Sequence, residues 1–221
     1  MTMRWRRGFL AGLALLIGAA PAAAQVRVGA RTGLVSSGAD VDGPLPYEIS
    51  SRLGAHASLT GAWDLSEHVR LQAEMAAQRW GWNADGIGID GSVGSTYLEL
   101  PLLALVRVPL KAPVGMHLIG GGALGFEIGC QANVALHGTR MSGDCDDPQL
   151  EIDRRKTEWG IRLGGGLNLD RGAAEFVLDV QRHVGLSDLD PDPGADQVLR
   201  MRAWLVSVGL AYRVGGRLKA G

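Results

Sequence analysis

Histidine is the first candidate for chemistry in this sequence, because imidazole is the side chain best suited to general acid–base work near neutral pH. His56, His117 and His183 fall at polar positions of alternating segments, and Ser58 lies two residues from His56 on the same face. A serine nucleophile and its histidine base must lie on the same face of a strand to form a hydrogen bond, although one such pair arises readily by chance. We therefore expect these histidines to bond to carboxylates inside the protein. We predict no catalytic residue, and a membrane-embedded hydrolase or acyltransferase stays the less favoured alternative.

Glycine supplies a second candidate site. Gly120, Gly122 and Gly125 have the spacing of the dinucleotide-binding fingerprint. That fingerprint needs a following helix whose N-terminus binds the pyrophosphate, whereas these glycines lie inside a predicted strand with no helix after it. We therefore predict no cofactor.

Aspartates at alternate positions could bind a cation. Asp188, Asp190 and Asp192 match the start of an EF-hand loop, but Pro193 and Leu199 stand where that loop needs glycine and glutamate. We expect a solvated acidic loop and predict no metal ligands.

Charge pairing is the chemistry that the remaining polar residues favour. Acidic and basic residues recur on one face of the alternating segments, and an eight-stranded barrel has an interior that only side chains fill. Charges enclosed there must pair, because an unpaired buried charge is strongly destabilising. The predicted network in the barrel interior, or lumen, consists of Arg27, Arg31, Arg52, Arg70, Glu74, Glu99, Glu127, Glu158, Arg162 and Asp179.

The sequence has two cysteines, Cys130 and Cys145, which lie in one polar segment. An exported chain enters an oxidising compartment, so a disulfide is expected. Closing a loop of this size stabilises a fold by about 3 kcal/mol in the chain-entropy model. A metal site is disfavoured because no second cysteine pair or nearby histidine completes it.

The elements that must position these residues are alternating strands, of which Tyr97–Val108 is the clearest. Its twelve residues are too few for a transmembrane helix and suit one tilted strand across a bilayer. Every second residue from Leu98 is apolar, whereas the opposite face carries Glu99 and Arg107.

The same period of two recurs along the chain and predicts further strands. We expect eight strands, at 26–36, 51–63, 68–82, 97–108, 116–128, 157–169, 174–184 and 199–214. The connections alternate between long and short, which is typical of outer-membrane barrels with short periplasmic turns and long external loops. The predicted fold class is therefore all-β, a closed eight-stranded antiparallel up-and-down β-barrel.

Alternation alone does not decide whether the apolar face meets a core or lipid, because a soluble barrel reverses the arrangement. The polar faces are poor in lysine, which favours a crowded lumen. Aromatic residues near the strand ends favour interfacial girdles, although Trp80, Trp82 and Tyr97 share the parity of the polar faces and would point inward unless a bulge intervenes. A soluble secreted or periplasmic barrel that binds an apolar ligand is the alternative.

The beginning of the chain has the pattern of a secretory signal peptide, with a basic n-region, an apolar stretch over 9–20 and small residues up to Ala24. The remaining chain carries 19 basic and 23 acidic residues, which disfavours a nucleic-acid partner. We expect residues 1–24 to be cleaved, a barrel over 25–214 and a short tail over 215–221. The predicted location is the outer membrane of a Gram-negative bacterium, after Sec export.

The run Tyr97–Leu103, YLELPLL, resembles the YLEIPLL segment of the PorT-like outer-membrane β-barrel family. The opening strand around Gly29 and Gly33, the glycine-rich run 120–125 and the segment 181–186 are similar to that family as well, although His183 stands where an aromatic is usual. The resemblance implies a small eight-stranded outer-membrane barrel, in a family mostly of unknown function. We expect a structural or interaction role without catalysis, with outer-membrane lipid around the barrel. A protein partner would meet the external loops, chiefly 129–156.

Overall fold

The computed structural model consists of β-strands, and none of the residues that it describes is helical. It describes residues 25–41, 47–86, 89–108, 110, 114–136, 139–148, 154–189 and 198–214. The predicted signal peptide and the predicted tail lie outside these residues. Within the described ranges there is no helix with the length and apolarity to cross a membrane.

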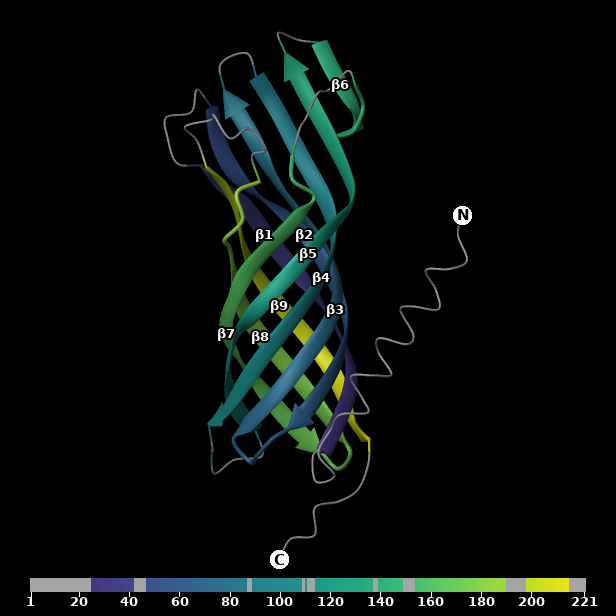
Figure 1. The fold of residues 1–221 in the computed structure, drawn as a ribbon, viewed down its shortest axis with the longest axis vertical. Helices are drawn as coiled ribbons and strands as arrows, with labels where there is room; N and C mark the ends of the chain where they lie inside the picture. Colours follow the sequence, from purple (N-terminus) through teal and green to yellow (C-terminus); the bar gives the residue numbers. More distant parts are fainter. Residues whose placement is uncertain are drawn as a thin grey trace, which may run out of the picture.

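Of the nine strands in the described ranges, eight close into a ring of antiparallel hydrogen-bonded pairs (Figure 1). The strands are β1 (Gln25–Val41), β2 (Tyr47–Asp64), β3 (Val69–Gly86), β4 (Ile89–Val108), β5 (Val114–Leu136), β6 (Thr139–Asp144), β7 (Thr157–Arg171), β8 (Ala174–Gly185) and β9 (Leu199–Val214). Each strand pairs with the next around the barrel, β5 pairs with β7, and β9 returns to β1. The ninth strand, β6, pairs with β5 outside the ring. The predicted fold class is confirmed.

The alternating sequence turns its apolar side chains outward. On β4, Leu102 is 55% exposed, whereas its neighbour Leu103 is completely buried. The same contrast repeats on β8, where the outward Phe176, Leu178 and Val180 are exposed. The soluble alternative is wrong, because it required the even-numbered face of β4 to lie inside the barrel.

Aromatic side chains mark both ends of the outward surface. Phe126, Trp159 and Trp204 are exposed towards the end with the long connections, and Phe176 and Tyr212 are exposed at the short-turn end. Outer-membrane barrels carry such girdles at their two interfaces.

Trp80 and Tyr97 are not part of the outer girdle. They are 1% and 3% exposed, and their rings stack inside the barrel with centroids 4.9 Å apart. Their inward direction follows from the parity that they share with the polar faces of β3 and β4.

The strands run further than the expected boundaries at the long-connection end. Most of the predicted loop 83–94 is a hairpin of β3 and β4, and the predicted loop 129–156 contains the end of β5 and all of β6. Figure 1 shows these strands rising beyond the rest of the barrel, with β6 at their outer edge. The fold therefore has a raised extension on one side of its rim.

The connection between β7 and β8 at the opposite end is a tight turn. Gly172 has a φ of 66° there, in the left-handed region that residues with a side chain rarely adopt. Glycine at this position lets two strands join through two residues, and it keeps this end of the barrel compact.

Candidate functional site

Ion pairs fill the lumen at three levels, and the lowest lies at the short-turn end. Asp64 accepts hydrogen bonds from Arg27 at 3.2 Å, Arg70 at 2.7 Å and Arg107 at 2.9 Å. Glu175 accepts from Arg27 at 3.1 Å and from Arg70 at 2.7 Å. These side chains come from β1, β2, β3, β4 and β8, so the cluster ties most of the ring together.

The middle level is organised around Arg31 of β1. Its guanidinium forms an ion pair with Asp179, lies 3.4 Å from Glu74 and donates to Gln72 Oε1 at 3.0 Å. His117 Nε2 lies 2.8 Å from the other oxygen of Asp179. One arginine thus faces two carboxylates, and a histidine bonds to the second side of one of them.

The upper level repeats this arrangement around Arg162 of β7. Its Nε donates to Glu99 at 3.1 Å, and its Nη2 donates both to the same carboxylate and, at 3.1 Å, to Gln78 Oε1. His183 Nε2 lies 2.9 Å from Glu158. All of these side chains are buried.

The structure places eight of the ten predicted network residues in these three levels. They are Arg27, Arg31, Arg70, Glu74, Glu99, Glu158, Arg162 and Asp179. Glu127 lies higher, at the rim, where Arg154 binds it in a bidentate contact. Arg52 has no ion pair with them: its guanidinium approaches Gly94 and Arg79 instead.

Residues at strand ends complete the lumen and were missed in the predicted network. Asp64 and Asp170 lie just outside the predicted strands 51–63 and 157–169, yet both form ion pairs with Arg27. Glu175 occupies a polar-face position of β8, and this parity was the signal that could have found it. Arg154 lies in a loop and has no periodic signal.

An apolar layer covers the upper charges. Val35, Trp80, Tyr97 and Leu205 form this layer with Leu189, which follows β8. The layer therefore separates the charged lumen from the external side.

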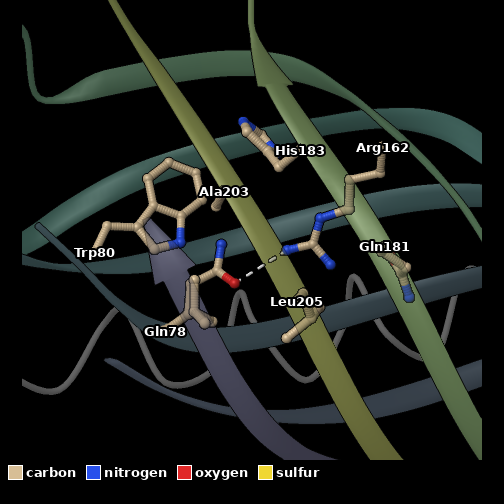
Figure 2. Close-up of a pocket in the computed structure, with 8 residues that line it drawn as sticks. Gln78, Trp80, Arg162, Gln181, His183, Ala203 and Leu205 are labelled. Atoms are coloured by element: carbon tan, nitrogen blue, oxygen red, sulfur yellow. Dashed lines mark hydrogen bonds between the residues drawn. The ribbon is translucent and has the colours of Figure 1, made fainter. Parts of the chain in front are cut away.

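A small cavity lies beneath this layer, at the level of the upper charges. Figure 2 shows Arg162 of β7 pointing towards Gln78 of β3 and donating to it, and Trp80, Gln181 and His183 also line this cavity. The enclosed volume is about 10 Å³. A cavity of this size holds about one water molecule, so this level has no room for a solute.

The candidate catalytic pair does not form. His56 Nδ1 lies 3.3 Å from Gln78 Oε1, and neither His56 Nε2 nor Ser58 Oγ has a hydrogen-bond partner among the described residues. Both side chains are buried inside the filled lumen. Over the described ranges, no group of three histidine, cysteine, aspartate or glutamate side chains is arranged to hold a metal.

A disulfide joins the raised extension to the loop that returns from it. Cys130 of β5 and Cys145, directly after β6, are bonded, with their Cα atoms 5.4 Å apart. The backbone N–H of Cys145 also donates to the carbonyl of Cys130 at 3.3 Å. The disulfide therefore lies at the base of the β5–β6 hairpin.

Ion pairs hold the following loop against the same strand. Arg154 contacts Glu127 of β5 and Asp146, and Lys156 Nζ lies 2.7 Å from Asp146. The hydrogen bond from Lys156 and the charges of Lys156 and Arg154 lower the pKa of Asp146 below its ordinary value. The loop is thus joined to the extension at both ends.

A groove runs along the raised extension, beyond the ring of the barrel. Its volume is about 290 Å³. The lining residues come from β4, β5 and β6: Asp90, Gly91, Ser92, Asn133, Val134, Ala135, Met141 and Ser142. The groove presents backbone, hydroxyl and amide groups with one exposed methionine, a mixture suited to contact with a peptide or protein surface.

Comparison with known proteins identifies a family match. Residues 20–190 match the outer membrane protein beta-barrel domain family. Comparison with curated protein sequences finds no match.

Among solved structures, OprG shares the barrel fold, and two further outer-membrane proteins match less closely. The outer membrane protein OprG from Pseudomonas aeruginosa superposes with a TM-score of 0.53 at 12% identity, over 89% of this chain and 98% of OprG. Neisserial surface protein A gives 0.47 at 12% identity, over 86% and 97% of the two chains. The Ail protein of Yersinia pestis, solved with the heparin analogue sucrose octasulfate, gives 0.42 at 16% identity, over 85% and 99%. At these identities the likeness concerns the fold alone.

Proposed function

The chain belongs to the outer membrane protein beta-barrel domain family and is located in the outer membrane, and from this premise we propose that it is a closed interaction barrel. In this role the barrel anchors the protein in lipid, and the raised extension of β4, β5 and β6 contacts a partner outside the cell. No solute passes through the lumen, and no reaction takes place in it.

The filled lumen is the observation that carries this proposal. Charged side chains pair across its interior at three levels, and an apolar layer covers them. The cavity between the upper charges and this layer holds about one water molecule. Transport of a solute needs a continuous path through the lumen, whereas a membrane anchor needs only a stable barrel.

The stapled extension supports the interaction half of the proposal. A disulfide, the Arg154–Glu127 contact and the Lys156–Asp146 contact fix the chain around β5 and β6. Ordering a surface in advance reduces the entropy that a partner's binding must overcome. The groove of about 290 Å³ gives that partner a concave contact.

A non-enzymatic role is favoured by the positions of the histidines. His117 and His183 each bond to a lumen carboxylate, and His56 faces Gln78. None of the three is open to a substrate, because all are buried within the filled interior.

We further propose that the protein is PorT-like within its family. The YLELPLL segment supports this assignment by its position: Tyr97, Glu99, Pro101 and Leu103 point inward and are buried, and Glu99 bonds to Arg162. Because one face of this segment contacts lipid and the other faces the lumen, the residue types on both faces are constrained.

Site-specific photo-crosslinking in intact cells tests the interaction role. We expect benzoylphenylalanine at Asn133 or Ser142, which line the groove, to yield a discrete protein adduct on irradiation. The matched control is the same residue at Leu178, which faces lipid on β8. The absence of adducts from both groove positions, or the same adducts from Leu178, would contradict the proposal.

A further inference from the structure

Two arginine side chains converge on the outer surface of the barrel, near its external end. Arg79 of β3 is exposed, and Arg52 of β2 lies where the pairing between β2 and β3 shifts register. A methyl group placed on Gly94 of β4 would lie 3.1 Å from Arg52 Nη1 and 3.6 Å from Arg79 Nε. Both guanidinium groups therefore lie over the same glycine.

The strands beneath the two arginines carry two facing glycines, which the Arg52 side chain covers. Gly94 pairs with Gly81 of β3, and a methyl group on Gly81 would lie 3.0 Å from Arg52 Cδ. Both glycines face outward, because the neighbouring pair of Trp80 and Ser95 points into the barrel. We call the surface made by Arg52, Arg79, Gly81, Gly94 and Thr96 the arginine notch; Thr96 is the cross-strand partner of Arg79.

The positive charges of the notch have no acidic partner in the part of the chain that the structure describes. Among the described residues no carboxylate forms an ion pair with Arg52 or Arg79, whereas Arg202, another outward arginine near this end, forms one with Asp40. Two cations held over one glycine repel each other unless an anion lies between them. Planar guanidinium groups are well suited to bind phosphate through paired hydrogen bonds.

The surface on the membrane side of the notch is apolar. Ala77 and Leu98, the next outward pair of β3 and β4, lie directly below Arg79 and Thr96, and the exposed Leu100 and Leu102 follow. An anion bound in the notch therefore lies at the top of a lipid-facing wall. This order of charge above and hydrocarbon below matches an amphiphile with a phosphorylated headgroup.

We propose that the arginine notch binds the phosphate group of an outer-leaflet lipid whose acyl chains lie against β3 and β4. Arg52 and Arg79 donate to the phosphate from the outer surface of the strands. A lipid is favoured over free phosphate because the apolar surface continues directly from the site. The binding does not depend on the role of the groove on β4, β5 and β6.

Native mass spectrometry of the folded protein in neutral detergent tests this binding. We expect the wild-type protein to carry diphosphoryl lipid A adducts and to bind dephosphorylated lipid A much more weakly. Each phosphate-binding arginine contributes about a fivefold increase in affinity for an anionic lipid surface. Arg52→Gln and Arg79→Gln should each weaken binding by roughly that factor.

Arg202→Gln is the matched control, because it removes one outward arginine whose charge Asp40 already neutralises. We expect this variant to bind lipid A as the wild type does, and heat-modifiable mobility on unboiled gels verifies that each variant is folded. Equal binding of phosphorylated and dephosphorylated lipid A by the wild-type protein would overturn the proposal without any variant. Unchanged binding in Arg52→Gln and Arg79→Gln would also overturn it, as would displacement of the lipid by equimolar inorganic phosphate, which would identify a site for free anions.

Discussion

Replacing Arg162 with methionine should destabilise the barrel strongly, because this arginine is the centre of the upper charge level. Its side chain is 1% exposed and bonds to Glu99 through two nitrogens and to Gln78 through one. It also lies 3.7 Å from Glu74. Glu99 is completely buried, so the substitution leaves a carboxylate without its main cationic partner in the interior.

Breaking a buried ion pair from one side costs about 3–5 kcal/mol, since the remaining charge is neither hydrated nor paired. We expect the free energy of unfolding to fall by about this amount in Arg162→Met. Reversible urea unfolding in lipid vesicles measures it. Tryptophan fluorescence is a suitable probe, because Trp80 lies in the apolar layer next to His183.

The double variant Arg162→Met with Glu99→Leu separates charge from packing. Removing both charges should restore much of the lost stability, because an apolar pair of similar volume often replaces a buried ion pair without cost. Arg182→Met is the control for loss of a positive charge on the outer surface, where its guanidinium stacks over Trp204. A loss below about 1 kcal/mol in Arg162→Met would show that the ion pair contributes little to stability, and additive losses in the double variant would show that the two charges are not coupled; either result contradicts the prediction.

Three further predictions test the lipid-facing surface, the disulfide and the loop that contains Asp146. Leu102→Lys places a charge on the lipid-facing surface and should lower the free energy of unfolding by about 2–4 kcal/mol, whereas Leu110→Lys, outside the strands, should change it little in the same urea assay. Cys130→Ser with Cys145→Ser should accelerate hydrogen exchange in β6, reflecting about 3 kcal/mol of lost local stabilisation, without shifting the urea midpoint of the barrel. Because Lys156 and Arg154 lower the pKa of Asp146, the loop contact is fully present above the ordinary carboxyl pKa of 3.8 and is lost as pH falls through the lowered value. Exchange protection of the loop should therefore stay constant from neutral pH to about 5 and decrease below 3.8, and Asp146→Asn should remove this step.

Alternation in single strands was enough to predict the wall of the barrel. In Tyr97–Val108 the even-numbered residues face lipid and the odd-numbered residues face the lumen, so the period of two assigns every side chain to a side. The charges of Glu99 and Arg107 and the scarcity of lysine indicated which of the two faces lines the lumen and which faces lipid. These are local properties, and local properties can be read from a sequence.

The raised extension was harder to predict, because it lies beyond the membrane and carries a weaker pattern. The alternation of β5 does continue through Cys130, Ala132 and Val134, and this signal could have identified the longer strand. The return of β6 depends on the register set by the disulfide and on the pairing of Gln131 with Asp144, which are tertiary features.

The partners within the lumen could be predicted as a group but not one by one. Arg27 was expected to find a carboxylate, yet its partners are Asp64, Asp170 and Glu175, two of which stand at strand ends. Strand tilt and stagger decide which residues share a level in a closed barrel. Arg52 illustrates the same limit, because the register shift in β2 directs it to Arg79 and Gly94 rather than to the charges of the lumen.

Single-channel recording in planar lipid bilayers tests the closed interaction barrel most directly. Charged residues and the apolar layer around Trp80 fill the lumen, so the account predicts no discrete conductance steps from the folded, inserted protein. Heat-modifiable mobility of protein recovered from the same vesicles verifies insertion. Stable, reproducible conductance steps would contradict the closed barrel, because ions would then pass the level of Gln78 and Arg162, where the cavity holds about one water molecule.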